Sequence, residues 1–379
     1  MRRGDRWLVA LPLLLTAIGL VMVYSAGSIF ALMAKSKGAD YFLIAQVQRA
    51  ALGLIALFVC SRVNLRWLER AAPWLLGIAS ALLVAVIVAG HVAKGASRWL
   101  SIGMLSIQPT DLARLAAVLF VAWWLKRRPP AEHGFWRGTM LPLGIVGVLS
   151  GLILLQPNLS SAGLLGMTGF GLLFFAGARM RHLAIPVLAG AAFVTVALLT
   201  HPYQMERFQT FVRYLVSGEL ESRGAGWQLD QSLIAIGSGG WFGRGIGAGL
   251  QKYLFLPEAH TDFIFSVMAE ETGFFGATVL FSLFALLVWR GMRVAARAAD
   301  PFLSLLAGGL TLQLGLYALA NLAVATGLAP TTGLPLPYVS FGGSALVANL
   351  MAAGLLYRIS ASNGADEALA RQRWSREGA

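Results

Sequence analysis

The chain has 379 residues, of which 57% are hydrophobic and only 12% charged, and its formal net charge is +13. A soluble globular domain carries about 25% charged residues, so this composition excludes an ordinary soluble enzyme. The single cysteine excludes an intramolecular disulfide and a thiolate metal site.

Apolar runs of about 20 residues, the length needed to cross a bilayer, recur from one end of the chain to the other. A membrane β-barrel would show short alternating segments instead. We therefore predict an all-α polytopic membrane protein, with one membrane domain over residues 1–358 and a C-terminal tail over 359–379. In chain order the ten expected spans are 7–30, 42–61, 72–90, 107–125, 139–156, 159–177, 183–200, 263–289, 302–325 and 338–358.

The basic residues predict the orientation of these spans. With the N-terminus in the cytoplasm, most of the 30 Lys and Arg residues fall into cytoplasmic segments, as the positive-inside rule requires. Ten spans then place both termini inside the cell. The net charge is explained by inner loops that face anionic membrane lipids, and the basic residues form no patch of the kind that binds nucleic acid.

Two features precede the longest loop. In the first large outer segment, Arg98 could meet an anionic headgroup of a lipid or a substrate, and Trp99 beside it is typical of a membrane boundary. Asp111 and Arg114 then lie three residues apart, so that they share one helix face. We interpret them as a structural ion pair that faces the bundle.

Residues 200–262 form the longest outer loop, and it contains the glycine-rich stretch 238–247. Its aromatic residues argue against disorder. The favoured interpretation is a re-entrant or interfacial segment packed on the bundle, and a phosphate-cradling loop is the alternative.

Asp262 ends this loop, just before a long apolar run. A carboxylate at a membrane edge is costly to desolvate, which favours a functional role. It could act as a general base, or it could merely cap the helix that follows. Glu270 and Glu271 lie about two turns deeper, and one of them is expected to pair with a basic residue of another span.

The segment 330–344 is rich in proline and glycine, which excludes a regular helix. Non-helical backbone at membrane depth is tolerated where it is buried in protein or lines a wet cavity. The segment is therefore expected to border an outward-facing cavity, with a plain structural turn as the alternative.

Together, the runs 226–245 and 256–265 closely resemble the SEDS family of cell-wall proteins, which includes FtsW, RodA and SpoVE. The stretches 21–26, 95–100 and 333–344 also resemble this family, and the sequence around Gln251 and Lys252 is closest to FtsW. The resemblance departs at Asn158, where the family often has an aspartate.

The resemblance implies ten spans with both termini in the cytoplasm, a location in the bacterial inner membrane, and a peptidoglycan glycosyltransferase that polymerises lipid II, in cell division. It implies that Asp262 is the catalytic residue and that Asp111 and Arg114 replace the family's usual Glu and Lys. It also implies a class B penicillin-binding protein as partner. The other candidates for substrate binding are Arg98, Trp99, Arg244, Lys252, His260, Thr261, Ser340, Gly342, Gly343 and Ser344.

Asp262 together with the phosphates of the substrate could also hold Mg²⁺ or Mn²⁺. Three alternatives stay open: a lipid II flippase, an elongation polymerase of the RodA type, and a scaffold that only recruits a synthase.

Overall fold

The structure is a computed structural model that describes residues 4–89, 91–93, 96–102, 105–220 and 224–377. Within these ranges, the side chains of residues 34, 89, 91–93, 96–98, 101–102, 105–106 and 364–377 fall outside the description.

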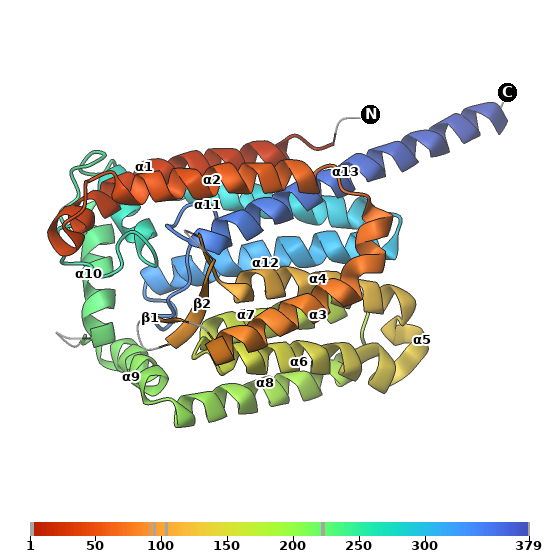
Figure 1. Ribbon diagram of the computed structural model, residues 1–379, viewed down its shortest axis with the longest axis horizontal. Helices are drawn as coiled ribbons and strands as arrows, with labels where there is room; N and C mark the ends of the chain where they lie inside the picture. The colour runs from red at the N-terminus through yellow and green to blue at the C-terminus, as the bar shows by residue number, and fades with distance from the viewer. Residues whose placement is uncertain (1–3, 90, 94–95, 103–104, 221–223, 378–379) are drawn as a thin grey trace.

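Long helices dominate the fold and lie side by side with their axes nearly parallel (Figure 1). In chain order, the helical elements of the described residues are α1 (Trp7–Lys35), α2 (Tyr41–Cys60), α3 (Leu65–Ala89), α4 (Pro109–Arg127), α5 (Pro130–Phe135), the π-helical turn η1 (Trp136–Met140), α6 (Leu141–Leu154), α7 (Leu159–Phe175), α8 (Met180–Thr200), α9 (Pro202–Ser217), α10 (Gly224–Ser238), α11 (Ile264–Arg297), α12 (Pro301–Ala325) and α13 (Gly343–Glu377). In the outer segment expected to be a loop, β1 (His91–Ala93), β2 (Ala96–Ile102) and β3 (Leu105–Ile107) form a small antiparallel sheet in that order.

Among the described residues, eight helices are long and apolar enough to cross a membrane. The other two expected spans are α7, which is apolar but only 17 residues long, and α4. The charges of Asp111, Arg114 and Lys126 lower the hydropathy of α4. Most of its residues are buried, and α3, α7 and α12 pack against it. This helix therefore faces protein rather than lipid, which explains how it tolerates these charges.

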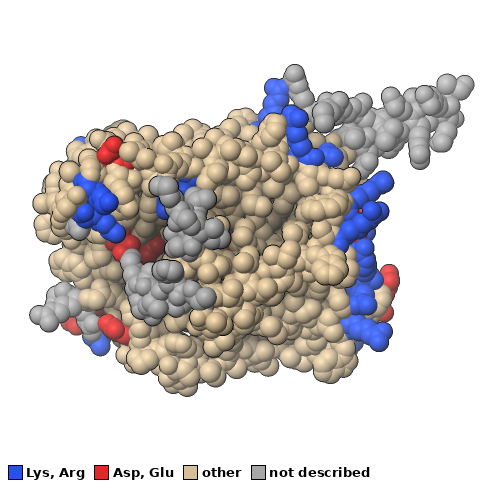
Figure 2. Space-filling model, viewed as in Figure 1, with Lys and Arg blue, Asp and Glu red and all other residues tan. Residues whose placement is uncertain are grey.

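The bundle has two unlike ends. Both termini and α5 lie at one end, and α9 and α10 lie across the other (Figure 1). Lys and Arg side chains gather along the end that carries the termini (Figure 2).

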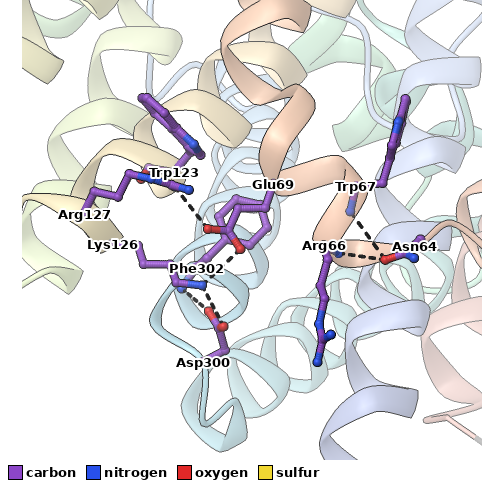
Figure 3. A network of polar contacts seen from close by, with 9 residues as sticks. All are labelled: Asn64, Arg66, Trp67, Glu69, Trp123, Lys126, Arg127, Asp300 and Phe302. Atoms are coloured by element: carbon purple, nitrogen blue, oxygen red, sulfur yellow. Dashed lines mark hydrogen bonds and ion pairs between the residues drawn. The ribbon is translucent and has the colours of Figure 1, made fainter.

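At the basic end, an ion cluster ties three helices together (Figure 3). Glu69 of α3 lies 3.0 Å from Lys126 Nζ and 3.1 Å from an Arg127 nitrogen of α4. Lys126 Nζ also donates to Asp300 at 2.8 Å, and Asp300 caps α12 by accepting the Phe302 N–H. In the same view, Asn64 accepts backbone N–H groups at the start of α3.

Candidate active site

Asp262 is half-buried at the end of the outer loop, two residues before α11 begins. Its backbone position is fixed by α12, because the Asn321 side-chain amide donates to the carbonyls of Asp262 and Leu334, each at 2.7 Å. An anion near a helix N-terminus is favoured by the helix dipole. The fold thus holds an acidic side chain at the end of the bundle that carries α9 and α10.

The proline-rich turn packs directly against this acidic residue. Ser340 Oγ donates to the Thr261 carbonyl at 2.6 Å and accepts the Leu336 N–H at 2.8 Å. The Phe341 N–H donates to the His260 carbonyl at 3.0 Å. The segments around 261 and 340, which are far apart in sequence, therefore form one unit.

Gly333 marks the point where the turn meets the carboxylate. It is exposed, its φ is +72°, and a Cβ built on it would lie 3.4 Å from Asp262 Oδ2. This left-handed conformation favours glycine. The lack of a side chain at Gly333 lets the turn approach the Asp262 carboxylate closely.

Three expected substrate contacts are engaged by the protein itself. His260 is buried, and its ring lies 4.4 Å from the Phe42 ring and 5.2 Å from the Phe30 ring. Thr261 Oγ1 donates to a Glu258 carboxylate oxygen at 2.9 Å. Ser340 is buried and uses its hydroxyl both as donor and as acceptor, so it positions the turn.

Lys252 is also committed to a buried partner. Its Nζ lies 2.8 Å from Glu271 Oε1, and both side chains are almost fully buried. It donates as well to Ser25 Oγ at 2.9 Å and to the Gly247 carbonyl at 2.6 Å. An ammonium has three donors, so this geometry leaves none for a substrate diphosphate.

Among the described residues, neither Glu270 nor Glu271 pairs with a basic residue of another span, contrary to the expectation that one of them would. Glu270 accepts the backbone N–H groups of Leu250 and Gln251, and Arg244 Nε approaches it to 4.0 Å. Both glutamates therefore fasten the outer loop to the first turns of α11. Arg244 belongs to this assembly, about two helical turns from Asp262.

The glycine-rich stretch packs on a break in α11. Gly273 has φ +67° and interrupts the helix, and a Cβ there would collide with the backbone of Trp241 and Gly243. The break frees two carbonyls and two N–H groups, which pair with the loop. The bonds run from Arg244 N–H to Glu270 O (3.0 Å), Gly245 N–H to Glu271 O (3.0 Å), Phe274 N–H to Gly240 O (2.9 Å) and Phe275 N–H to Trp241 O (3.2 Å). The glycine-rich stretch is thus packed on the bundle, as the favoured interpretation expects.

Asp111 and Arg114 lie in the buried part of α4, with 3.6 Å between Asp111 Oδ1 and an Arg114 nitrogen. Ser344 Oγ donates to Asp111 Oδ2 at 2.6 Å and accepts the Gln108 N–H at 3.0 Å. Arg114 also donates to Asn349 Oδ1 at 2.7 Å. Ser344 thus joins the start of α13 to the start of α4.

The remaining candidates for substrate binding lie in β2 and at the start of α13. Trp99 is half-buried in β2, and the side chain of Arg98 lies outside the described residues. A Cβ at Gly342 would meet only ordinary contacts, which leaves its backbone approachable, and Gly343 starts α13. Asn158 accepts the Ser161 N–H and caps α7, a role that suits asparagine as well as aspartate.

A divalent cation would have to rely on Asp262 and the substrate. The described residues contain no group of three or more His, Cys, Asp or Glu side chains that could hold a metal. One carboxylate combined with phosphate oxygens and water is a usual ligand set for Mg²⁺. Asp262 therefore fits the cation only when a phosphorylated substrate completes the site.

Sequence reasoning missed Asn321, which fixes the backbone of Asp262. A signal was present, since an amide inside the apolar run 302–325 is costly unless it is hydrogen-bonded. It also missed Gln46 of α2, whose amide donates to the Ser340 carbonyl at 3.1 Å.

Comparisons with known proteins agree with this arrangement. The chain matches the family model described as "Cell cycle protein", for FtsW, RodA and SpoVE, over residues 5–364. It is 41% identical over 361 residues to a probable peptidoglycan glycosyltransferase FtsW of Thioalkalivibrio sp., covering 94% of this chain and 89% of that protein. It is 38% identical over 358 residues to stage V sporulation protein E of Bacillus subtilis, covering 94% and 96%.

A solved structure shares the whole fold. A chain from a peptidoglycan synthase complex, described in terms of polymerization and crosslinking, superposes with a TM-score of 0.77 at 31% identity, covering 95% of this chain and 98% of that one. The helical bundle therefore belongs to a known architecture. The chain is a member of the FtsW/RodA/SpoVE family of multi-pass membrane proteins.

Proposed function

We propose that this protein is a peptidoglycan glycosyltransferase that polymerises lipid II at the outer face of the cytoplasmic membrane, in cell division. Family membership and the FtsW names of its relatives support the activity and the division role. The observation that carries the assignment is the half-buried Asp262, fixed through its backbone and lying against Gly333 of the proline-rich turn.

The reaction is an inverting glycosyl transfer. The 4-hydroxyl of one lipid-linked disaccharide attacks C1 of the MurNAc that ends the growing chain. A new glycosidic bond forms, the C1–O bond to undecaprenyl diphosphate breaks, and Asp262 accepts the hydroxyl proton. A positioned general base contributes about 10²–10⁴-fold to such a step.

The leaving diphosphate requires positive charge. Lys252 and Arg244 are held by Glu271 and Glu270, so Arg98 and a cation bound by Asp262 and the diphosphate remain from the predicted set. A bound Mg²⁺ or Mn²⁺ would neutralise the charge that develops on the leaving group.

The basic end of the bundle faces the cytoplasm in this proposal, together with both termini, and the end with α9, α10 and Asp262 faces outward. The asymmetry of Lys and Arg in Figure 2 supports this orientation. The partner is a class B penicillin-binding protein, supported by the match to a peptidoglycan synthase complex.

The test is polymerisation of purified lipid II by the protein and its partner, with Mn²⁺ and with chelator. Asp262→Asn should lower the rate by at least 10²-fold while leaving the melting profile unchanged. Asp40→Asn, which removes an exposed carboxylate at the start of α2, is the matched control and should polymerise normally. Polymer formation by Asp262→Asn at the wild-type rate would reject the assignment.

A lipid II flippase is the second candidate, and the break in α11 favours it. Discontinuous membrane helices are frequent at the substrate sites of transporters. A flippase should move labelled lipid II across liposomes without forming polymer, and Asp262→Asn should leave that transport intact.

A further inference from the structure

Arg207 of α9 reaches the same turn that lies against Asp262. Its guanidinium donates to the Thr331 carbonyl at 2.9 Å, two residues before Gly333. It also donates to the Tyr203 hydroxyl and stacks over the Tyr203 ring, 4.5 Å from the ring centre. These contacts hold the guanidinium against the turn.

Several polar atoms lack hydrogen-bond partners at the junction where α9 meets the segment 330–344. Among the described residues, Arg207 Nε, Thr331 Oγ1 and Thr332 Oγ1 are buried and make no hydrogen bond. Thr331 is only 7% exposed. A buried donor without a partner costs about 1–3 kcal/mol, so three of them within two adjoining segments call for a ligand.

The charge at this junction is also unbalanced. Within the described part of the chain, no carboxylate forms an ion pair with Arg207. A guanidinium has five N–H groups in a planar fork, a geometry that suits phosphate oxygens. Threonine hydroxyls can add further donors to the same anion.

We infer that Arg207, Thr331 and Thr332 form a binding site for the diphosphate of a polyprenyl-linked substrate, beside Asp262. The inference rests on the proposed function, since it names the part of the substrate that this turn receives. Arg207 supplies the positive charge that Lys252 and Arg244 cannot, and α9 brings it from an outer helix. The site binds the oxygens of the diphosphate and leaves the proton transfer to Asp262.

A binding experiment tests the site without requiring catalysis. The full chain in nanodiscs of fixed phosphatidylglycerol content is titrated with undecaprenyl diphosphate and, as an uncharged control, with undecaprenol. Arg207→Gln should weaken diphosphate binding about 10–100-fold, since a charge-assisted hydrogen-bond pair is lost, and should leave undecaprenol binding unchanged. Arg213→Gln, which removes an exposed arginine of the same helix, is the matched control and should change neither.

Thr331→Val separates ligand binding from a structural role. It keeps the backbone carbonyl that Arg207 contacts and removes only the buried hydroxyl, so the fold is retained. We expect diphosphate binding about 3–10-fold weaker and a melting temperature no lower than that of the wild type, because the variant removes an unpaired buried hydroxyl. Unchanged diphosphate binding in both Arg207→Gln and Thr331→Val would overturn the inference.

Two further outcomes are decisive. In a second series, the titration is repeated in nanodiscs with increasing fractions of phosphatidylglycerol. If binding of undecaprenyl diphosphate falls in proportion to that fraction, the site holds bulk lipid headgroups and the inference is wrong. If the wild type binds the diphosphate through Arg207 but forms no polymer, the site stands and the proposed polymerase activity fails.

Discussion

The Asn321 side chain fixes the backbone of Asp262. Its amide nitrogen donates to the carbonyls of Asp262 and Leu334, each at 2.7 Å. The helix that carries Asn321 is α12, whereas Asp262 precedes α11. The position of the acidic residue therefore depends on how these two helices pack.

Replacing Asn321 with alanine should impair both stability and activity. The buried Leu334 carbonyl loses its donor, at about 1–3 kcal/mol, and the part-buried Asp262 carbonyl loses the bond that fixes it. Because a displacement of about 1 Å can cost about 10²-fold, polymerisation by the folded protein should fall by about 10–10²-fold. The control is Asn363→Ala, which removes a buried amide bonded to the Val294 carbonyl in the part of α13 nearer the C-terminus. It should lower the melting temperature but not the specific activity, and equal activity losses in the two variants would contradict this prediction.

Lys252→Met should destabilise the protein strongly. It leaves the Glu271 carboxylate buried without its cation, which costs about 3–5 kcal/mol. The double variant Lys252→Met/Glu271→Gln should regain most of the loss, as measured by thermal unfolding in detergent. A Lys252→Met protein with wild-type stability and a raised KM for lipid II would instead assign the lysine to substrate binding.

Gly273→Ala should prevent correct packing of the glycine-rich loop. A residue with a Cβ is disfavoured at φ +67° by about 1–2 kcal/mol, and the new methyl group would also collide with the loop backbone. We expect a lower folded yield by size-exclusion chromatography. Gly166→Ala in α7 is the control, because an added Cβ there meets nothing within 4 Å, and it should be neutral or slightly stabilising. A normal yield for Gly273→Ala would contradict the described break.

The ion cluster at the basic end predicts a pH dependence. Burial alone would raise the pKa of Asp300, but hydrogen bonds from Lys126 and from the Phe302 N–H outweigh it and lower that pKa. A carboxyl with a lowered folded pKa stabilises the protein above its unfolded pKa of about 3.9, and the contribution is lost as pH falls through the folded value.

The melting temperature of Asp300→Asn should therefore lie below that of the wild type by a constant amount between about pH 5 and pH 8. The gap should close only below about pH 4, as followed by thermal unfolding in detergent. A difference in melting temperature that grows as the pH is lowered would refute the prediction, because it would mean that protonation of Asp300 stabilises the protein.

Much of the bundle could be predicted because hydrophobic length is a local property. All ten apolar runs became helices, and the i,i+3 spacing of Asp111 and Arg114 brought their side chains within 3.6 Å. The small sheet at 91–107 was missed because its strands are short and lie within a polar loop.

The contacts of single loop residues were harder to predict, because they depend on tertiary packing. Lys252 and His260 were expected to face the substrate, as charged and polar loop residues often do. The fold instead surrounds the lysine with Glu271 and Ser25 and the histidine with aromatic rings. The glycines of 238–247 indicated that the backbone of this stretch packs closely against another part of the protein. They did not indicate that this part is the interrupted backbone of α11.

The interruption at Gly273 divides α11 into two helical segments. The short segment, 264–272, follows Asp262, and the long segment, 274–297, runs on toward the opposite end of the bundle. The outer loop is hydrogen-bonded to both segments. The loop therefore splints the break, because its backbone hydrogen bonds stand in for those that α11 loses at Gly273. The direction of the first turns of α11, and with it the placement of Asp262, depends on the loop as well as on the helix itself.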